Sequence, residues 1–443
     1  MNYKKLITIL FAFTPFLLVA QVAKVELVQK GSKWELLRDG KPYYIKGVGG
    51  QLHLDKAVEI GANSIRTWST EKAKEYLDEA HKRGLTVCMG LWVGQERQGF
   101  DYGKAEAVKG QFEHFKKKVQ ELKDHPALLM WAIGNEVDLF YTDYRVWDAV
   151  QDIAEMIHEL DPNHPTTTVT AGLHQKDVQK IMKQAPDIDI MGINTYGDLI
   201  RAVDSVEHFG WHGPFIIAEW GPNGHWEVAK TPWGAPIEQS SSEKAASYEK
   251  RYAHIAASAD RCLGSYVFQW GQKQETTSTW YGLFDVYGNG TEPLDRLYQA
   301  WKSSPPPNSC PRISSYEILG SKKGLEKNRL NAGVKYEVRV KFEDPDNDRL
   351  KVKWEIVQES TDIKSGGDAE SAPPAVLGLI KRKSNESMTF KAPNIEGAYR
   401  VFITAYDGAG NIGYVNIPFY AKMNPNGNEK IQLKKRKISL GYR

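Results

Sequence analysis

Short apolar runs recur along the first part of the chain and are separated by amphipathic stretches. Eight runs have the length and the β-branched and aromatic content of buried strands. They cover residues 45–49, 63–68, 86–92, 128–136, 167–171, 190–196, 215–220 and 265–270. Helical periodicity marks the segments 71–83, 110–124, 144–160, 175–184 and 242–257. Strands that alternate with helices predict a parallel sheet, and eight of them close a (β/α)8 TIM barrel. We therefore predict an α/β fold with a TIM barrel over residues 45–303.

A proline-rich segment and a change of period mark the end of this pattern. Pro305, Pro306 and Pro307 lie in a predicted linker over residues 304–311. Beyond it, apolar and polar residues alternate with period two. The clearest strands cover residues 336–342, 350–357, 387–391, 399–406 and 413–420. This pattern predicts an immunoglobulin-like β-sandwich over residues 312–423, with a mobile loop at 360–376 and a solvated basic tail at 424–443.

The N-terminus has the pattern of an export signal. Lys4 and Lys5 precede an apolar run that ends at Leu18-Val19-Ala20. The run is short for a membrane span, which takes about 20 residues. We predict a signal peptide over residues 1–20, no transmembrane segment in the mature chain, and a periplasmic or secreted protein. Residues 21–44 predict a short β-hairpin that caps the barrel.

Composition and charge narrow the classes of partner. The 443 residues carry 58 Lys and Arg against 55 Asp and Glu, and no basic stripe with interleaved aromatics stands out, so nucleic acid is not an expected partner. The 13 Trp, 21 Tyr and 15 Phe residues suit the flat faces of sugars as well as core packing. No spacing resembles a metal site, so no metal and no cofactor are expected. The sequence leaves open the oligomeric state and whether Cys262 and Cys310 form a disulfide.

Polar and aromatic side chains follow the predicted strands at their C-terminal ends, where TIM barrels carry their chemistry. Glu136 ends the fourth run and Glu219 lies in the seventh, and a carboxylate there is costly to bury unless something uses it. Paired carboxylates at strand ends are the groups that cleave glycosidic bonds. The further candidates, expected to bind an oligo- or polysaccharide, are His53, Arg66, Trp68, Trp92, Asn135, Asn194, Tyr196, Trp226 and Trp270.

These motifs resemble the retaining glycoside hydrolases of clan A. The resemblance rests on glutamates at strands four and seven and on the Asn135-Glu136 pair. Arg66 on strand two, Tyr196 on strand six and Trp270 on strand eight strengthen it. The segments 38–48 (RDGKPYYIKGV) and 62–68 (ANSIRTW) are similar to the start of the barrel in glycoside hydrolase family 2. They also resemble the β-1,3-glucan-acting families of the clan. By this likeness, Trp270 is expected to form the floor of the reacting subsite.

The resemblance implies a role for the other members of the site. Glu136 is expected to be the acid/base and Glu219 the nucleophile, with their carboxyl groups about 5–5.5 Å apart. Arg66 and Tyr196 would hold Glu219 in its ionised form by charge and hydrogen bond. Asn135 would bond the sugar 2-hydroxyl in the transition state.

The expected function is a secreted retaining β-glycoside hydrolase that cleaves a β-linked glucan or related polysaccharide by double displacement. The short loop after the first strand and the lone hairpin before the barrel favour a groove for a polymer over exo-activities such as β-glucuronidase. A glucan transglycosylase of the same chemistry is one alternative, because water and an acceptor sugar compete for the intermediate. A non-catalytic carbohydrate-binding protein is another. The sugar, its linkage and endo or exo action are left open.

Overall fold

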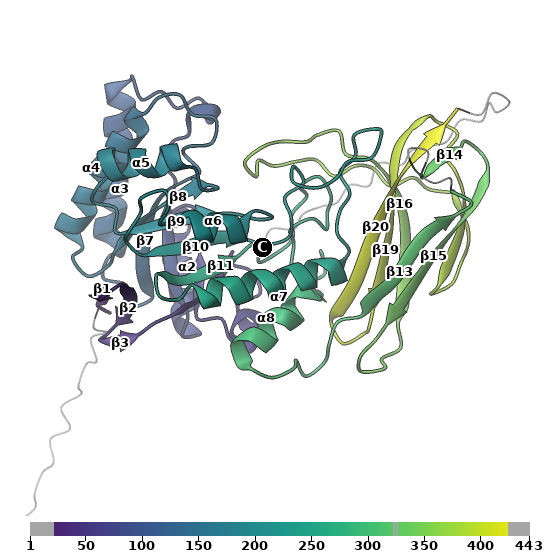
Figure 1. Cartoon of the computed structure of the whole chain (residues 1–443), viewed down its shortest axis with the longest axis horizontal. Coiled ribbons are helices and arrows are strands. Elements are labelled where there is room, and N and C mark those ends of the chain that lie inside the picture. The colour runs from purple at the N-terminus through teal and green to yellow at the C-terminus, as the bar shows by residue number, and fades with distance from the viewer. Residues whose placement is uncertain (1–21, 322–323, 325–326, 424–443) are drawn as a thin grey trace, which may run out of the picture.

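The computed structural model describes residues 22–321, 324 and 327–423. Within this part of the chain, eight parallel strands form a closed barrel in the order β10-β11-β4-β5-β6-β7-β8-β9 (Figure 1). The strands are β4 (Ile45–Gly49), β5 (Ser64–Arg66), β6 (Thr86–Leu91), β7 (Leu128–Asn135), β8 (Thr166–Ala171), β9 (Ile190–Asn194), β10 (Phe215–Trp220) and β11 (Cys262–Val267). The predicted TIM barrel is confirmed.

Helices cover the outside of the barrel through apolar stripes. They are α1 (Leu54–Ile60), α2 (Ala73–Lys82), α3 (Ala105–Leu122), α4 (Arg145–Leu160), α5 (Gln175–Gln184), α6 (Leu199–Ser205), α7 (Ser241–Ala257) and α8 (Pro293–Lys302), with a short 3-10 turn, η1 (Glu96–Gln98). In α4, Val150, Ile153 and Ile157 are buried, and their spacing of three and four residues places them on one face. The sequence pattern did not predict α6 and α8.

The last barrel strand runs three residues earlier than predicted, since β11 ends at Val267 rather than at Trp270. Gly264 lies inside this strand with a φ of 124°, and a Cβ atom there would lie 2.2 Å from the carbonyl oxygen of Ile45. Close backbone approach therefore requires glycine at this position. Gly264 interrupts the apolar run, and for that reason the pattern favoured the stretch 265–270, which follows the glycine.

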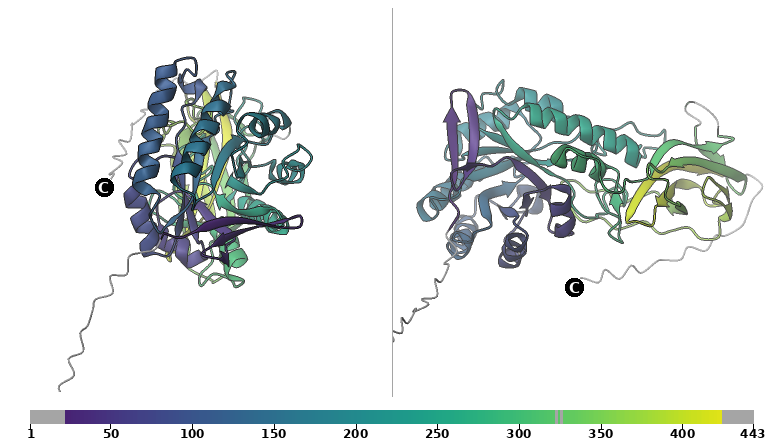
Figure 2. Two further views of the ribbon diagram at one scale, coloured as in Figure 1. Left: turned by 90° about the vertical axis from the view of Figure 1, so that its left-hand side faces the viewer. Right: turned by 90° about the horizontal axis from the view of Figure 1, so that it is seen from below.

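A small antiparallel sheet covers the N-terminal ends of the barrel strands (Figure 2). It consists of β1 (Val25–Lys30), β2 (Lys33–Arg38) and β3 (Lys41–Pro42). The Val25 N–H donates to the Asn163 carbonyl at 2.8 Å, and Arg38 Nη2 donates to the Pro126 carbonyl at 2.8 Å. Both carbonyls lie just before barrel strands, so the sheet packs on the end of the barrel opposite the C-terminal ends of the strands.

The C-terminal domain consists of two sheets that pack across one core. One sheet has the order β12-β20-β19-β16, with β14 also paired to β20, and the other has the order β13-β15-β18-β17. These strands are β12 (Gly290–Thr291), β13 (Arg312–Leu319), β14 (Arg329–Asn331), β15 (Lys335–Glu343), β16 (Lys351–Gln358), β17 (Ile380–Lys383), β18 (Ser387–Lys391), β19 (Gly397–Tyr406) and β20 (Asn411–Lys422). Trp354, Phe390 and Phe419 are buried between the sheets. The assignment to the immunoglobulin-like type stays a prediction.

Three carboxylates of this domain, from Asp344, Asp348 and Asp407, lie within 4.8 Å of one another. Asp344 and Asp407 each accept hydrogen bonds from two backbone N–H groups of their own turns. Aspartate caps turns in this way without an ion, so turn geometry accounts for the cluster.

The two domains share a buried polar interface. Lys244 of α7 donates to Glu238 at 2.6 Å and to the hydroxyl of Tyr414, on β20, at 3.0 Å. Arg400 of β19 donates to the Pro236 carbonyl at 2.6 Å. Because both partners of the Lys244–Glu238 ion pair are almost fully buried, losing either one would leave an uncompensated charge inside the protein. The interface therefore fixes how the two domains sit on each other.

The predicted signal peptide (1–20) and basic tail (424–443) lie outside the described residues. Across the described ranges, no helix has both the length and the apolar character to cross a membrane. Cys88, Cys262 and Cys310 are buried and free. Cys262 and Cys310 therefore form no disulfide in this structure.

Candidate active site

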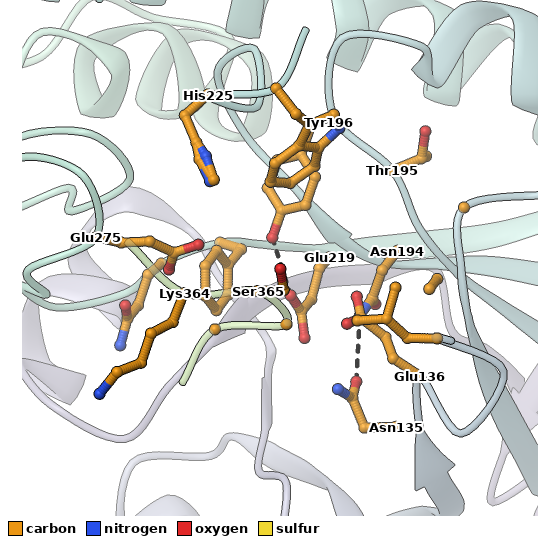
Figure 3. A pocket seen from close by; sticks show the side chains of 18 of the residues that line it. Asn135, Glu136, Asn194, Thr195, Tyr196, Glu219, His225, Glu275, Lys364 and Ser365 are labelled. Atoms are coloured by element: carbon orange, nitrogen blue, oxygen red, sulfur yellow. Dashed lines mark hydrogen bonds between the residues drawn. The ribbon is translucent and has the colours of Figure 1, made fainter. Parts of the chain in front are cut away.

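A cavity of about 580 Å³ opens at the C-terminal ends of the barrel strands, a size within the range of small-molecule sites. Both predicted catalytic carboxylates, Glu136 and Glu219, line this cavity. Figure 3 shows the two side chains turned into the same space. The other predicted residues that line it are Trp68, Trp92, Asn135, Asn194, Tyr196 and Trp226. The structure thus brings most of the predicted set together.

Glu219 lies in β10 and is almost fully buried. Among the described residues, three side chains donate to its carboxylate. Arg66 Nη1 and Trp68 Nε1 donate to Oε1 at 2.8 and 2.7 Å, and the Tyr196 hydroxyl donates to Oε2 at 2.9 Å. Burial and the charge of Glu219 raise the pKa of Tyr196 well above its usual range, so the phenol keeps the proton that it donates. A buried guanidinium, an indole N–H and a phenol thus fix the position of the Glu219 carboxylate.

Glu136 follows β7 directly and is the second carboxylate. Its φ is 51°, in the left-handed region that residues other than glycine rarely adopt, and such local strain is typical of functional sites. Asn194 Nδ2 donates to Oε1 of Glu136 at 2.9 Å. Burial, and after it the charge of Glu219, raises the pKa of Glu136 to about 8. The raised pKa favours a proton on Glu136 at neutral pH, and different surroundings of this kind give two carboxyl groups different roles.

A chain of hydrogen bonds joins the two carboxylates beneath the cavity. Arg66 Nη2 donates to Oδ1 of Asn135 at 2.7 Å, while its Nη1 holds Glu219. Asn194 Nδ2 reaches the same Oδ1 at 3.1 Å and also holds Glu136. Because one guanidinium and two amides connect both glutamates, a shift of any member disturbs the spacing of the pair.

Aromatic rings form much of the wall of the cavity. Trp92, Phe140 and Trp226 are 36%, 68% and 58% exposed, which is unusual for rings of this size. Trp226 packs edge-on against Tyr196, with ring centroids 5.9 Å apart. Exposed rings around a polar centre are suited to stack on the apolar faces of sugars.

Three predicted residues lie away from the cavity surface. Arg66 is buried beneath it and acts through Glu219 and Asn135. His53 is exposed and packs against Phe284 with tilted rings, whose centroids are 4.5 Å apart. Trp270 is 1% exposed and packs on the same Phe284, with centroids 4.9 Å apart.

The placement of Trp270 corrects the expectation that it forms the floor of the reacting subsite. The correction follows from the end of β11, which lies three residues earlier than predicted. Phe268, next to the strand end, lines the cavity in its place, and Trp270 turns into the layer outside the strands.

The cavity also contains residues outside the predicted set. From the barrel these are Leu139, Ala171, Gly172, Leu173, His174, Thr195, Asp198, Glu227, Phe268, Gln269, Lys273 and Glu275. Residues 364–367 of the C-terminal domain line it too. The barrel residues could have been predicted from their position in the sequence, because they lie at or after the ends of the predicted strands. The contact of the polar loop at 360–376 with the barrel could not be predicted, because the alternation of apolar and polar residues carries no information about it.

Charge in the cavity is mainly negative. Over the described ranges, its acidic lining residues are Glu136, Asp198, Glu219, Glu227 and Glu275, and its lysines are Lys273 and Lys364. Lys273 Nζ lies 2.8 Å from a carboxylate oxygen of Glu275. Lys364 Nζ donates to the Ala369 carbonyl and lies 3.6 Å from Asp362. Both lysines thus already have oxygen partners within the protein.

Comparison with known proteins agrees with this geometry. Residues 59–225 match the family model described as glycosyl hydrolases family 2, TIM barrel domain. This part of the chain is therefore similar to the TIM barrel domain of glycosyl hydrolases family 2. The match includes both Glu136 and Glu219.

Several relatives are named β-glucuronidase. The protein of Sus scrofa is 25% identical over 221 residues, which cover 42% of this chain and 32% of that protein. The protein of Homo sapiens is 23% identical over 184 residues, covering 37% and 27%. The matched part of this chain thus spans between about a quarter and a third of the length of these relatives.

Solved structures show the same barrel. A β-glucuronidase from an uncultured Clostridium sp. superposes with a TM-score of 0.50 at 19% identity, covering 64% of this chain and 54% of that chain. The β-glucuronidase of Ruminococcus gnavus gives a TM-score of 0.50 at 16% identity, covering 64% and 53%. At this identity the likeness supports the fold alone.

Proposed function

We propose that this protein cleaves a β-glycosidic bond with retention, using Glu219 as nucleophile and Glu136 as acid/base. One observation carries the proposal. Two carboxylates share a cavity, and their surroundings differ: three donors hold Glu219, whereas burial and the neighbouring charge raise the pKa of Glu136. Retaining glycosidases need one ionised and one protonated carboxyl group on either side of the scissile bond.

In the first step, a carboxylate oxygen of Glu219 attacks the anomeric carbon of the sugar. The bond from that carbon to the leaving oxygen breaks, and the proton of Glu136 moves to this oxygen. The sugar is now an ester of Glu219, and Glu136 is a carboxylate. Loss of the charge on Glu219 removes the repulsion that, after burial, raised the pKa of Glu136, so Glu136 becomes better able to remain ionised.

In the second step, Glu136 takes a proton from a water molecule while the water oxygen attacks the anomeric carbon. The ester bond breaks, Glu219 becomes a carboxylate again, and Glu136 is protonated for the next cycle. Two displacements on one carbon return the original configuration. An acceptor sugar that replaces this water would give transglycosylation, and the lengths of the products from a single oligosaccharide distinguish the two outcomes.

We propose an uncharged β-linked glucan or related oligosaccharide as the substrate. A uronic acid brings a carboxylate, which needs a cation within hydrogen-bonding distance. The lysines of the cavity are already paired with oxygens, and the cavity carries an excess of carboxylates. Figure 3 shows the amine of Lys364 on the side of the site away from Glu136. A β-glucuronide is the second candidate, because the relatives carry the name β-glucuronidase.

We also propose that the chain is exported, on the basis of the charged and apolar pattern of residues 1–20. Mass spectrometry of protein isolated from the producing cells tests this proposal. The expected N-terminus lies close to residue 21, and a mature protein that begins at Met1 would contradict export with cleavage.

The function is tested with p-nitrophenyl β-glycosides of glucose, galactose and glucuronic acid and with β-glucan oligosaccharides. Turnover of a neutral β-glycoside by the wild type, and its loss in Glu219→Gln, is the expected result. Turnover of the glucuronide alone would favour the second candidate. Binding of the oligosaccharides without turnover by the wild type would overturn the enzyme proposal and support a binding protein.

A further inference from the structure

Residues 362–371 form a closed loop between β16 and β17 of the C-terminal domain. At its neck, one carboxylate oxygen of Asp362 accepts the backbone N–H and the hydroxyl of Ser371, both at 2.8 Å. Within the loop, Glu370 accepts the N–H of Lys364 at 2.9 Å. Figure 1 shows yellow-green loop segments that extend from the C-terminal domain towards the barrel. The closed neck makes this loop a unit that is separate from the two sheets.

One side of the loop is held by the segment after β6. Arg97 Nη1 lies 3.0 Å from Asp368, and the Arg97 guanidinium also donates to the carbonyls of Ser365 and Gly366 at 3.4 and 3.3 Å. Gln98 adds a hydrogen bond to Asp368 at 3.2 Å. The Arg97 side chain is 9% exposed, so it is covered by the loop that it holds.

The other side is held by the segment after β11. Lys273 Nζ donates to the Gly367 carbonyl at 2.6 Å. The Thr276 N–H donates to Glu370 at 2.6 Å. The loop therefore bridges two parts of the barrel rim, and those parts follow different strands.

Between these two anchors the loop faces the cavity. Residues 364–367 line it together with the catalytic pair. Gly366 and Gly367 have φ angles of 64° and 72°, which L-residues with a side chain rarely adopt. A Cβ atom on Gly366 would lie 2.6 Å from Arg97 Nη2 and 2.9 Å from Leu139 Cδ2. The glycines thus let the backbone pass closely over the rim.

We propose that the loop 362–371 is a wall of the active site that determines which glycans are cleaved, by contacting sugar units beyond the one that reacts. The inference rests on the proposed function. A monosaccharide glycoside reacts between Glu136 and Glu219 and needs no such wall. A longer glycan that extends past residues 364–367 meets their backbone and the Ser365 side chain, which supply hydrogen bonds to hydroxyl groups.

This wall also changes the expectation, based on the short loop after the first strand, that the active site is an open groove. The barrel loop after β4 is short, but the second domain supplies a wall in its place. Specificity is then a property of the two-domain unit, and the buried interface around Lys244 keeps the loop in register with the barrel.

The test compares three variants of the full chain: residues 363–370 replaced by a short Gly-Ser linker, Gly366→Ala, and the control Gly378→Ala. Gly378 has a similar φ of 80° in the same domain, and a Cβ atom there meets nothing within 4 Å. In the first two variants, kcat/KM on β-glucan oligosaccharides is expected to fall about fivefold or more through KM, as for loss of one or two hydrogen bonds. Turnover of a p-nitrophenyl monosaccharide glycoside is expected to stay within about twofold. The control is expected to match the wild type on both substrates.

Equal changes on short and long substrates, or no change on either, would overturn the wall proposal while the glycosidase proposal stands. If the wild type cleaves none of the substrates, the proposed function fails by itself. The wall proposal is then tested by calorimetry, which measures the affinity of the same oligosaccharides for the wild type and for the loop variants. Affinity that is unchanged by removal of the loop, or no binding to the wild type, would reject it.

Discussion

Arg66 holds Glu219 through a contact of 2.8 Å, and the two side chains are only 1% and 7% exposed. The same guanidinium binds Asn135 through its other nitrogen. A planar fork of this kind fixes two acceptors at once, which a lysine ammonium does not reproduce. The position of Glu219 is therefore set by a residue that never touches the cavity.

We expect Arg66→Lys to lower kcat/KM on a p-nitrophenyl β-glycoside by roughly 10²-fold, the cost of losing one preorganised electrostatic contact. The charge is kept, but the bridge to Asn135 is lost. Steady-state kinetics and thermal unfolding measure the effect. Arg38→Lys, at the opposite end of the barrel, is the control and is expected to keep full activity. An Arg66→Lys variant that folds and retains wild-type kinetics would show that the bridge does not matter.

The pH dependence of kcat/KM is expected to show an alkaline limb. General acid catalysis requires protonated Glu136, and burial and the charge of Glu219 raise the pKa of Glu136 to about 8. The rate therefore falls as the pH rises through this value. In Glu136→Gln the limb is expected to disappear, and the residual rate on a p-nitrophenyl glycoside becomes flat over this range. If the alkaline limb persists unchanged in Glu136→Gln, it must come from the titration of another group.

Glu136→Gln is also expected to raise stability at alkaline pH. A carboxyl group whose pKa rises on folding, here from 4.5 to about 8, binds its proton more tightly in the folded state. Its contribution to stability is complete below the lower value and is lost as the pH rises through the upper one. Removing the charge should therefore stabilise the fold at pH 9 by roughly 1–3 kcal/mol, with little effect at pH 4. The difference in Tm between wild type and variant at the two pH values tests the sign.

Substitutions of Phe268 and Trp270 are expected to have different effects, one on KM and the other on Tm. Phe268 lines the cavity, so Phe268→Ala should raise KM for a β-glycoside about tenfold, as for the loss of an aromatic contact. Trp270 is buried against Phe284, so Trp270→Phe should lower Tm and leave KM within about twofold. Kinetics and thermal unfolding of both variants decide. A raised KM in Trp270→Phe with an unchanged KM in Phe268→Ala would instead support the prediction from the sequence that Trp270 forms the floor of the reacting subsite.

The barrel was predictable because strands buried on both faces are continuous apolar runs. The run that became β10 carries Glu219 within it, and a carboxylate in such a run is conspicuous. The error at β11 arose because Gly264 interrupts the apolar run within that strand. A backbone approach that only glycine permits is a tertiary feature, and hydrophobic alternation does not encode it.

The contribution of the C-terminal domain to the site was not predictable in this way. The segment around Ser365 is polar and glycine-rich, which is the composition of a solvated loop. Its contact with Arg97 depends on how two domains pack, through buried groups such as Lys244 that look like ordinary surface residues in the sequence. Local patterns describe what each segment can form, and the packing of domains decides which segments meet.

Covalent trapping tests the central claim most directly. An activated 2-deoxy-2-fluoro β-glycoside slows both displacements, so the ester intermediate accumulates and its peptide can be sequenced by mass spectrometry. We expect one sugar per chain, attached to Glu219, and no label in Glu219→Gln. A label on Glu136 or on a residue outside the cavity, or inverted product from a turnover substrate that the enzyme cleaves, would contradict the account.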